Sequence, residues 1–423
     1  MLTSDPSPQP GPASVSRRHR ATDSSTRPPR RVLILCGDAD GNLGDRAIVQ
    51  AMCHALRQAA PHLDLHLTVP SASAERAAGA YNAATLPTGP RALPALLRAA
   101  RGSDLVICGG GGLFQDDDSL IKMPYWAMRL ALVRHLGRAR RIAGVSLGIG
   151  PLHAATSRHF ARRALTRLDP LSARDPLACE LARSITGRHV ELAPDPALLL
   201  EPAPPHHAAA LLRNAGVPLD GRPLIGVAPR RFFPPAPRIV PHRLACRVPG
   251  RAARQHRANH KLATLLAATL DRLLDHTAGH VLFLPTYNRP YEADDALCRH
   301  IAAAMRHRAH HLIRIDAPAL YKAVAGRLNV MLGGRMHPLI LAAGAGTPIV
   351  ALAYNPKFQG LCDMLNLPHQ LLDVVTFVNQ SRTAELETRL TNALHGQARP
   401  PTRVAELADL TRSFLKQLAA TIP

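Results

Sequence analysis

The stretch RVLILCGDADGNLGD, residues 31–45, begins with an apolar run and continues into a turn rich in Gly and Asp. An apolar run of this length predicts a strand that is buried on both faces. Residues 46–59 follow with apolar side chains at helical spacing. A strand, a glycine-rich turn and a helix in this order predict the first unit of a parallel sheet with helices on its faces, which is the α/β fold class.

The same alternation continues along the chain. It pauses at residues 202–219 and starts again at the apolar run of residues 224–230. The restart predicts two α/β domains, and since ligands bind beyond the carboxyl ends of parallel strands, it predicts a site in the cleft between them. We expect a disordered basic tail, a first domain, a second domain that carries the anion-binding motifs, and a C-terminal helical segment. Their predicted ranges are 1–30, 31–215, 216–385 and 386–423.

The composition limits the classes of partner. The chain of 423 residues has a net charge of +22, which favours polyanions or an anionic membrane face as partners. Aromatic residues make up 4%, too few for a stacking platform, so we expect no nucleic-acid partner. Neither a secretory signal nor an apolar stretch long enough to span a bilayer occurs, so we expect a cytoplasmic protein with at most a peripheral contact at the inner face of the membrane.

The seven Cys residues form no CxxC pair and have irregular spacing, which argues against disulfides and zinc sites. We therefore expect reduced and mostly buried cysteines. No metal constellation occurs in the sequence, and we expect neither a metal nor a cofactor.

The segments GGRMH (333–337) and YNPK (354–357) place Arg335, His337 and Lys357 within an apolar part of the chain. Buried charges are normally paired or used. No Asp or Glu lies between Asp316 and Asp363, so the neighbouring sequence offers these cations no partner. A bound anion would supply one. The alternative is pairing with acids from elsewhere in the chain, such as Asp195 or Asp175.

Several further residues are site candidates, each with a structural alternative. In GNLGD (41–45), the glycines and the start of a helix favour a bound anion, but a plain turn capped by Asp45 has the same pattern. In GGGG (109–112), close approach to a substrate competes with tight packing, and the spacing does not fit a dinucleotide fingerprint. Arg174 and Asp175, in SARD, form either part of the site or a surface ion pair, and Asp195 has the same ambiguity. The candidates from these motifs are Gly41, Asn42, Asp45, Gly110, Gly111, Gly112, Arg174 and Asp175.

Residues 230–261 contain nine Lys and Arg and no acid. Such a block predicts a solvated, mobile loop, although a patch for anionic lipid or for a pyrophosphate-bearing acceptor is the functional alternative. Arg230, at the end of a predicted strand, is a better site candidate than the rest of the block.

Taken together, the motifs NLGD, DLVICGGGGLFQDD, SLGIGP, SARD, DPAL, GGRMHPLILAAGAGTP and YNPK, in this order, resemble the polysaccharide pyruvyl transferase family. The resemblance covers residues 32–367. It implies two Rossmann-like domains in a glycosyltransferase-B-like arrangement with an interdomain cleft. It also implies transfer of pyruvate from phosphoenolpyruvate, as a ketal, to a pair of sugar hydroxyls on a cell-surface polysaccharide or its polyprenyl-pyrophosphate-linked precursor.

The resemblance extends to single positions. The RxH element of the family falls on Arg335 and His337, its downstream Lys on Lys357, its strand-end Arg on Arg174 and, more loosely, another Arg on Arg230. These cations would hold the phosphate and carboxylate of the donor. His337 would act as general acid, and Lys357 would neutralise the leaving phosphate.

Asp175 or Asp195 would take the proton of the attacking hydroxyl. The chain departs from the family pattern at Arg46, where a Glu is common, and in the long basic block after Arg230.

Two rival functions remain open at this point. The first is a glycosyltransferase that uses a nucleotide sugar, because the same two-domain fold supports that activity. The second is a basic protein that binds nucleic acid or anionic lipid without catalysis.

Overall fold

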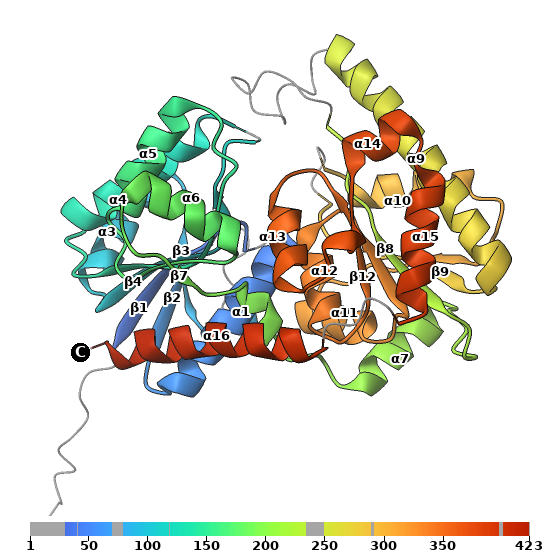
Figure 1. The fold of residues 1–423 in the computed structure, drawn as a ribbon. Helices are drawn as coiled ribbons and strands as arrows, with labels where there is room; N and C mark the ends of the chain where they lie inside the picture. Colours follow the sequence, from blue (N-terminus) through green and yellow to red (C-terminus); the bar gives the residue numbers. More distant parts are fainter. Residues whose placement is uncertain are drawn as a thin grey trace, which may run out of the picture.

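The computed structural model describes residues 30–39, 41–69, 79–117, 119–233, 249–288, 292–396 and 401–422. Two parallel sheets, each flanked by helices, form two α/β domains that lie side by side (Figure 1). This architecture confirms the predicted fold class. Nearly all of the predicted tail at residues 1–30 lies outside the described residues.

The first sheet has seven strands in the order β3-β2-β1-β4-β5-β6-β7. Its elements are β1 Arg31–Leu35, α1 Leu43–Ala59, β2 Asp64–Val69, β3 Ala84–Pro87, η2 Pro90–Ala92, α3 Leu93–Arg101, β4 Leu105–Phe114, α4 Lys122–His135, β5 Ile142–Ile149, α5 Ala155–Leu165, β6 Leu171–Ala173, α6 Pro176–Thr186, β7 Glu191–Leu192 and η3 Pro196–Leu199.

The second sheet has six strands in the order β10-β9-β8-β11-β12-β13. Its elements are α7 Pro205–Asn214, β8 Leu224–Ala228, α9 Pro249–Thr277, β9 His280–Phe283, α10 Asp294–Ala304, β10 His310–Leu312, α11 Pro318–Ala325, β11 Val330–Gly333, α12 Met336–Ala343, β12 Ile349–Ala353, α13 Lys357–Met364, η4 Pro368–Gln370, β13 Leu371–Asp373, α14 Val374–Gln380 and α15 Thr383–Leu394.

Strand β1 is buried on both faces, as its apolar run predicted. Leu33 and Leu35 pack with the helices on one face of the sheet, whereas Val32 and Ile34 pack on the opposite face. In register, Val32 lies beside Leu65 of β2 and Leu105 of β4. The strand order reverses between β1 and β4, and again between β8 and β11 in the second sheet. Such reversals open a crevice at the carboxyl ends of the strands.

The last helix, α16 (Pro401–Ala420), leaves the second domain and returns to the first (Figure 1). It packs against α1 and η3, and its residues Phe414, Leu415 and Leu418 join the core beneath Val49. Helix α15, by contrast, packs on α9 of the second domain. Helix α7 packs on α11, and the predicted domain boundary at residues 215 and 216 falls directly after it.

The basic block, residues 230–261, was predicted to form a mobile loop, but part of it is helical. Residues 249–261 belong to the first turns of α9, where Ala, Arg and Gln are good helix formers. Arg254, Arg257 and Lys261 nevertheless remain exposed. Residues 234–248, with Arg238 and Arg243, lie outside the described residues.

The six cysteines in the described part of the chain are buried and free. In the same part of the chain, no helix is long and apolar enough to cross a membrane.

Candidate active site

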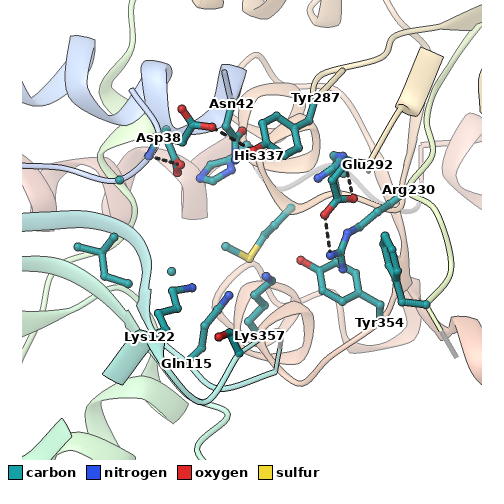
Figure 2. A pocket seen from close by; sticks show the side chains of 18 of the residues that line it. Asp38, Asn42, Gln115, Lys122, Arg230, Tyr287, Glu292, His337, Tyr354 and Lys357 are labelled. Atoms are coloured by element: carbon teal, nitrogen blue, oxygen red, sulfur yellow. Dashed lines mark hydrogen bonds and ion pairs between the residues drawn. The ribbon is translucent and has the colours of Figure 1, made fainter. Parts of the chain in front are cut away.

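A cavity of about 720 Å³ lies between the two domains (Figure 2). The ends of β1 and β4 with the loops that follow them form most of its first-domain wall, to which Arg174 after β6 is added. The loops that follow β8, β9, β11 and β12 form the opposite wall. These are the carboxyl ends of the strands on both sides of each reversal in strand order, so the predicted interdomain site is confirmed as a cavity.

Two thirds of the predicted site residues meet in this cavity. The predicted residues that line it are Asn42, Asp45, Gly112, Arg174, Arg230, Arg335, His337 and Lys357. Gly41, Gly110, Gly111 and Asp175 are described by the structure but do not line it. Among the described residues, no group of three or more His, Cys, Asp or Glu is placed to hold a metal ion.

Arg335 is paired with two acids of the protein itself, so it does not depend on a bound anion for a partner. Its Nε and Nη2 donate to the two carboxylate oxygens of Asp294 at 2.6 Å, and Nη2 also donates to Glu292 Oε2 at 2.9 Å. These acids precede Arg335 by 41 and 43 residues in the sequence. They meet it because β9 and β11 both flank β8, which brings the loops after these strands together.

Arg230 and Lys357 surround the ring of Tyr354. The Arg230 guanidinium lies 3.7 Å from the ring centroid, and Lys357 Nζ lies 4.6 Å from it. Arg230 also donates to Glu292 Oε1 at 3.2 Å. Burial would raise the pKa of Tyr354, but the two cations hold it below its ordinary value. A positive corner is therefore built into the second-domain wall.

The first domain contributes to the same corner. Lys122 and Gln115 point toward Lys357 across the cavity (Figure 2). Burial would raise the pKa of Asp117, but Lys357, Lys122 and Arg230 hold it below its ordinary value. Asp117 also accepts a hydrogen bond from Asn355 Nδ2 at 3.0 Å, which joins the two domains.

His337 lies in the first turn of α12 and is held between the two domains. Its Nε2 is 3.6 Å from Asp195 Oδ2, and the same carboxylate oxygen is 3.6 Å from Arg174 Nη1. Burial would raise the pKa of Asp195, but His337 and Arg174 hold it below its ordinary value. The imidazole thus has a buried carboxylate behind it, an arrangement that orients a His for proton transfer.

Gly44 makes room for this imidazole. A Cβ atom at Gly44 would lie 2.0 Å from His337 Nδ1, so any other residue would displace the ring. This role was not predicted from the sequence, although Gly44 lies in GNLGD, directly before the predicted helix. Gly110, with φ of +75°, similarly permits contact with Ile48 of α1, which favours the packing alternative for GGGG.

The backbone donors of GNLGD are used inside the loop. Gly41 N–H donates to Asp38 Oδ1 and Gly44 N–H donates to Asn42 Oδ1, both at 2.9 Å. Asn42, rather than Asp45, caps α1. Asp45 instead accepts from the Asp38 N–H at 3.1 Å and lines the cavity, where burial raises its pKa.

Asp175 and Asp195 both cap helical turns. Asp175 accepts from the Ala178 N–H at 2.8 Å at the start of α6, and Asp195 accepts from the Ala197 N–H at 3.0 Å at the start of η3. Arg174 lies beside both carboxylates, at 3.6 Å from each. The three residues thus form a buried ion cluster rather than a surface pair.

Sequence reasoning also missed several residues that line the cavity. Glu292 and Tyr287 lie in the loop after β9, where no sequence motif marked a site. Lys122 is the first residue of α4, and Tyr354 lies in YNPK, three residues before Lys357. Tyr287 donates to Asp38 Oδ2 at 3.0 Å and so links the domains on the side of the cavity away from Lys357.

Buried polar atoms that make no hydrogen bond gather around the cavity. They are buried and make no hydrogen bond with the described part of the chain: Gln115 Oε1, Asp117 Oδ1, Arg174 Nε, Asp195 Oδ2, Arg230 Nε and His337 Nε2. Such atoms are uncommon in folded proteins, and their concentration here is typical of a polar ligand site.

A pH-dependent stability effect follows from Glu292. Burial would raise its pKa, but Arg230 and Arg335 lower it from 4.5 to about 2. Because the folded-state pKa lies below the unfolded one, the stabilisation is present above about pH 4.5 and is lost as the pH falls toward 2. We expect Glu292→Gln to lower the free energy of unfolding by about 3 kcal/mol at neutral pH and by much less near pH 3.

Chemical denaturation of the wild type and the variant between pH 3 and pH 7 measures this difference. Glu180→Gln, at an exposed position on α6, is the matched control. A difference that does not change with pH would contradict the assignment.

Comparisons with known proteins come from sequence and from structure. A family model described as polysaccharide pyruvyl transferase matches residues 42–356. A search of the curated proteins finds no match. The matched residues include every residue that lines the cavity except Gly37, Asp38 and Lys357.

Solved structures with the same fold include two UDP-GlcNAc 2-epimerases. The enzyme from Neisseria meningitidis, bound to UDP-GlcNAc, aligns with a TM-score of 0.59 and 10% identity over 93% of this chain and 100% of its own. The enzyme from Methanocaldococcus jannaschii aligns with a TM-score of 0.59 and 10% identity over 92% of this chain and 99% of its own. A glycosyltransferase from Rickettsia africae aligns with a TM-score of 0.52 and 8% identity over 93% of this chain and 98% of its own. At these identities the likeness shows the fold alone, and it confirms the glycosyltransferase-B-like arrangement.

Proposed function

The chain belongs to the polysaccharide pyruvyl transferase family, and from this premise we propose that it transfers pyruvate from phosphoenolpyruvate to two hydroxyls of a sugar as a ketal. The observation that carries the proposal is the positive corner of the cavity, where Lys122 of the first domain faces Arg230 and Lys357 of the second. No cofactor enters the proposed reaction.

The charges of the cavity suit this donor. Phosphoenolpyruvate carries a phosphate and a carboxylate, both ionised at neutral pH. The walls of the cavity contain five Lys and Arg side chains against three Asp and Glu. Because charge-assisted hydrogen bonds are stronger than neutral ones, a cavity with this excess of cations favours a multiply charged anion. Lys122, Arg230 and Lys357 would hold the phosphate.

Arg335 acts indirectly in this proposal. Its guanidinium is committed to Glu292 and Asp294, so its part is to hold the acid that in turn orients Arg230. The direct role inferred from the family resemblance therefore passes mainly to Lys357 and Arg230.

The chemistry proceeds in two steps, in which the first hydroxyl adds to the donor and the second displaces phosphate. The imidazolium of His337 delivers a proton to the methylene carbon of the donor, and the oxygen of the first sugar hydroxyl forms a bond to C2. The proton of that hydroxyl passes to a carboxylate. The second hydroxyl then attacks C2 and gives its proton to the His337 imidazole, which restores the imidazolium. The bond between C2 and the phosphate oxygen breaks, and the phosphate leaves with its charge neutralised by Lys357 and takes up the proton held by the carboxylate.

Two carboxylates assist His337. Asp195, buried behind the imidazole, is a positioning residue because it does not line the cavity. Asp45 lines the cavity beside His337, and its raised pKa suits proton uptake at neutral pH better than an ordinary carboxylate would. We therefore assign the general base to Asp45 in place of Asp175, which caps α6 outside the cavity.

The acceptor is the less defined substrate. A cavity of 720 Å³ lies in the upper part of the range for small-molecule sites, which leaves room for a sugar unit beside the donor. We propose a cell-surface polysaccharide unit, or its polyprenyl-pyrophosphate-linked precursor, on the cytoplasmic side of the membrane where phosphoenolpyruvate is made.

Calorimetric titration with phosphoenolpyruvate tests the proposal. We expect saturable binding to the wild type and a Kd that is about 10–100-fold higher for Lys357→Met, because one charge-assisted hydrogen bond is lost. Lys416→Met is the matched control, since Lys416 is exposed on α16 and does not line the cavity.

UDP-N-acetylglucosamine serves as the competing ligand in the same titration. No binding of this nucleotide sugar is the expected result. If it binds and phosphoenolpyruvate does not, the proposed donor is wrong and the glycosyltransferase alternative replaces it.

A further inference from the structure

Helix α4 carries an apolar stripe that no described residue covers. Four of the eight exposed large hydrophobic residues lie on it or at its ends: Ile121 is 61% exposed, Tyr125 43%, Met128 56% and Leu136 55%. Spacings of four, three and eight residues place all four on one face of the helix. Leu132 lies on the same face and is half-buried.

This stripe is distinct from the face that packs on the sheet. Met123, Trp126, Leu130 and Val133 of α4 are buried in the core of the first domain. The helix is therefore apolar on two faces, of which only one is used within the described fold. Contiguous exposed apolar surface on a monomer is typical of a binding surface.

The charge around the stripe is of one sign. No Asp or Glu occurs between Asp118 and Asp169, whereas the same stretch contains one Lys and nine Arg. This stretch forms α4 and α5, which pack directly against each other (Figure 1). Arg158, Arg162 and Arg163 of α5 are exposed, as are Arg134 and Arg138 at the end of α4 and after it.

From these observations we propose that the outer face of α4 and α5 binds the surface of an anionic lipid bilayer. An apolar stripe flanked by the arginines of these two helices matches both layers of such a membrane, because the stripe enters the acyl boundary and the arginines contact the headgroups. A nucleic acid would match the arginines but leave the stripe without a partner.

The surface is continuous with the cavity. Ile121 and Tyr125 belong to the stripe and also line the cavity, together with Lys122 between them. Arg129 donates to the Tyr125 hydroxyl at 3.1 Å, which holds this ring at the rim. A protein docked through α4 and α5 therefore has the first-domain edge of its cavity next to the bilayer.

Cosedimentation of the full chain with lipid vesicles tests the proposal. We expect binding to vesicles made of equal parts phosphatidylglycerol and phosphatidylcholine, weaker binding in high salt, and little binding to phosphatidylcholine alone. Met128→Glu/Leu136→Glu lowers the partition coefficient at least about tenfold, since two apolar side chains no longer enter the interface. Arg162→Gln/Arg163→Gln, which changes charge without touching the stripe, lowers it about 30-fold.

Two matched double variants test whether the loss of any exposed leucines or arginines, outside α4 and α5, has the same effect. Leu219→Glu/Leu410→Glu alters exposed leucines away from α4, and Arg254→Gln/Arg257→Gln alters exposed arginines of α9. Both should bind vesicles as the wild type does. The thermal midpoint of every variant is measured to confirm that it folds.

Three results would overturn the proposal: no binding of the wild type to anionic vesicles, unchanged binding of the α4 variant, or loss of binding in the α9 variant. A change in oligomeric state of the α4 variant with unchanged vesicle binding would assign the stripe to a protein contact instead. The assay contains no phosphoenolpyruvate, so its outcome is independent of the proposed donor.

Discussion

Replacement of His337 by alanine is expected to lower kcat by about 10²–10⁴-fold and to leave the Kd for phosphoenolpyruvate nearly unchanged. The reason is that the imidazole supplies a proton in the transition state, whereas the positive corner at Lys357 and Arg230 supplies the donor contacts. Single-turnover release of phosphate measures the first quantity, and calorimetry measures the second.

His395→Ala is the control for this variant, because His395 is exposed after α15 and does not line the cavity. Equal loss of binding and turnover in His337→Ala would place His337 among the donor contacts. Unchanged turnover would exclude it as the general acid.

The largest effect on stability is expected from Arg335→Ala. This variant leaves the Asp294 carboxylate buried without its cation and removes one of the two cations that pair with Glu292, and removal of one member of a buried ion pair typically costs about 3–5 kcal/mol. The free energy of unfolding, obtained from denaturant titration at neutral pH, should fall by this amount. Loss of donor binding by this variant alone would therefore not identify Arg335 as a donor contact.

Arg222→Ala provides the contrast, because Arg222 pairs with Asp220 at the surface and such exposed pairs contribute little to stability. If Arg335→Ala unfolds at the same denaturant concentration as the wild type, the ion cluster is not a stabilising element. Arg335 would then be available to the donor after all.

The strands were predictable because their burial leaves a simple pattern. Runs such as that of residues 32–36 are apolar at every position, since helices cover both faces of the sheet. The end of β4 is harder to predict from the sequence, because the apolar run stops at Cys108 whereas the strand continues through the glycines to Phe114. Glycines weaken the strand signal even where, as at Gly109, they pair with a neighbouring strand.

The partners of the site cations were not predictable from local sequence. No acid lies between Asp316 and Arg335, yet Glu292 in the loop after β9 and Asp294 at the start of α10 contact this Arg. To find them, the order of the strands in the sheet would have to be known, because only adjacency in the sheet brings those loops together.

The two apolar faces of α4 illustrate a different limit. Trp126 and Leu130 identify the segment as a helix, but Met128 and Leu132 fit helical spacing equally well. Sequence periodicity cannot tell which stripe packs on the sheet when both are apolar.

The return of α16 to the first domain has a consequence for biosynthesis. During translation, domains generally fold in order from the N-terminus. The first domain, however, takes Phe414, Leu415 and Leu418 into its core, and these residues are made only after the second domain is complete. While the chain is still on the ribosome, the face of α1 that α16 covers is therefore exposed, and the nascent first domain presents an apolar surface to chaperones until synthesis has passed residue 418.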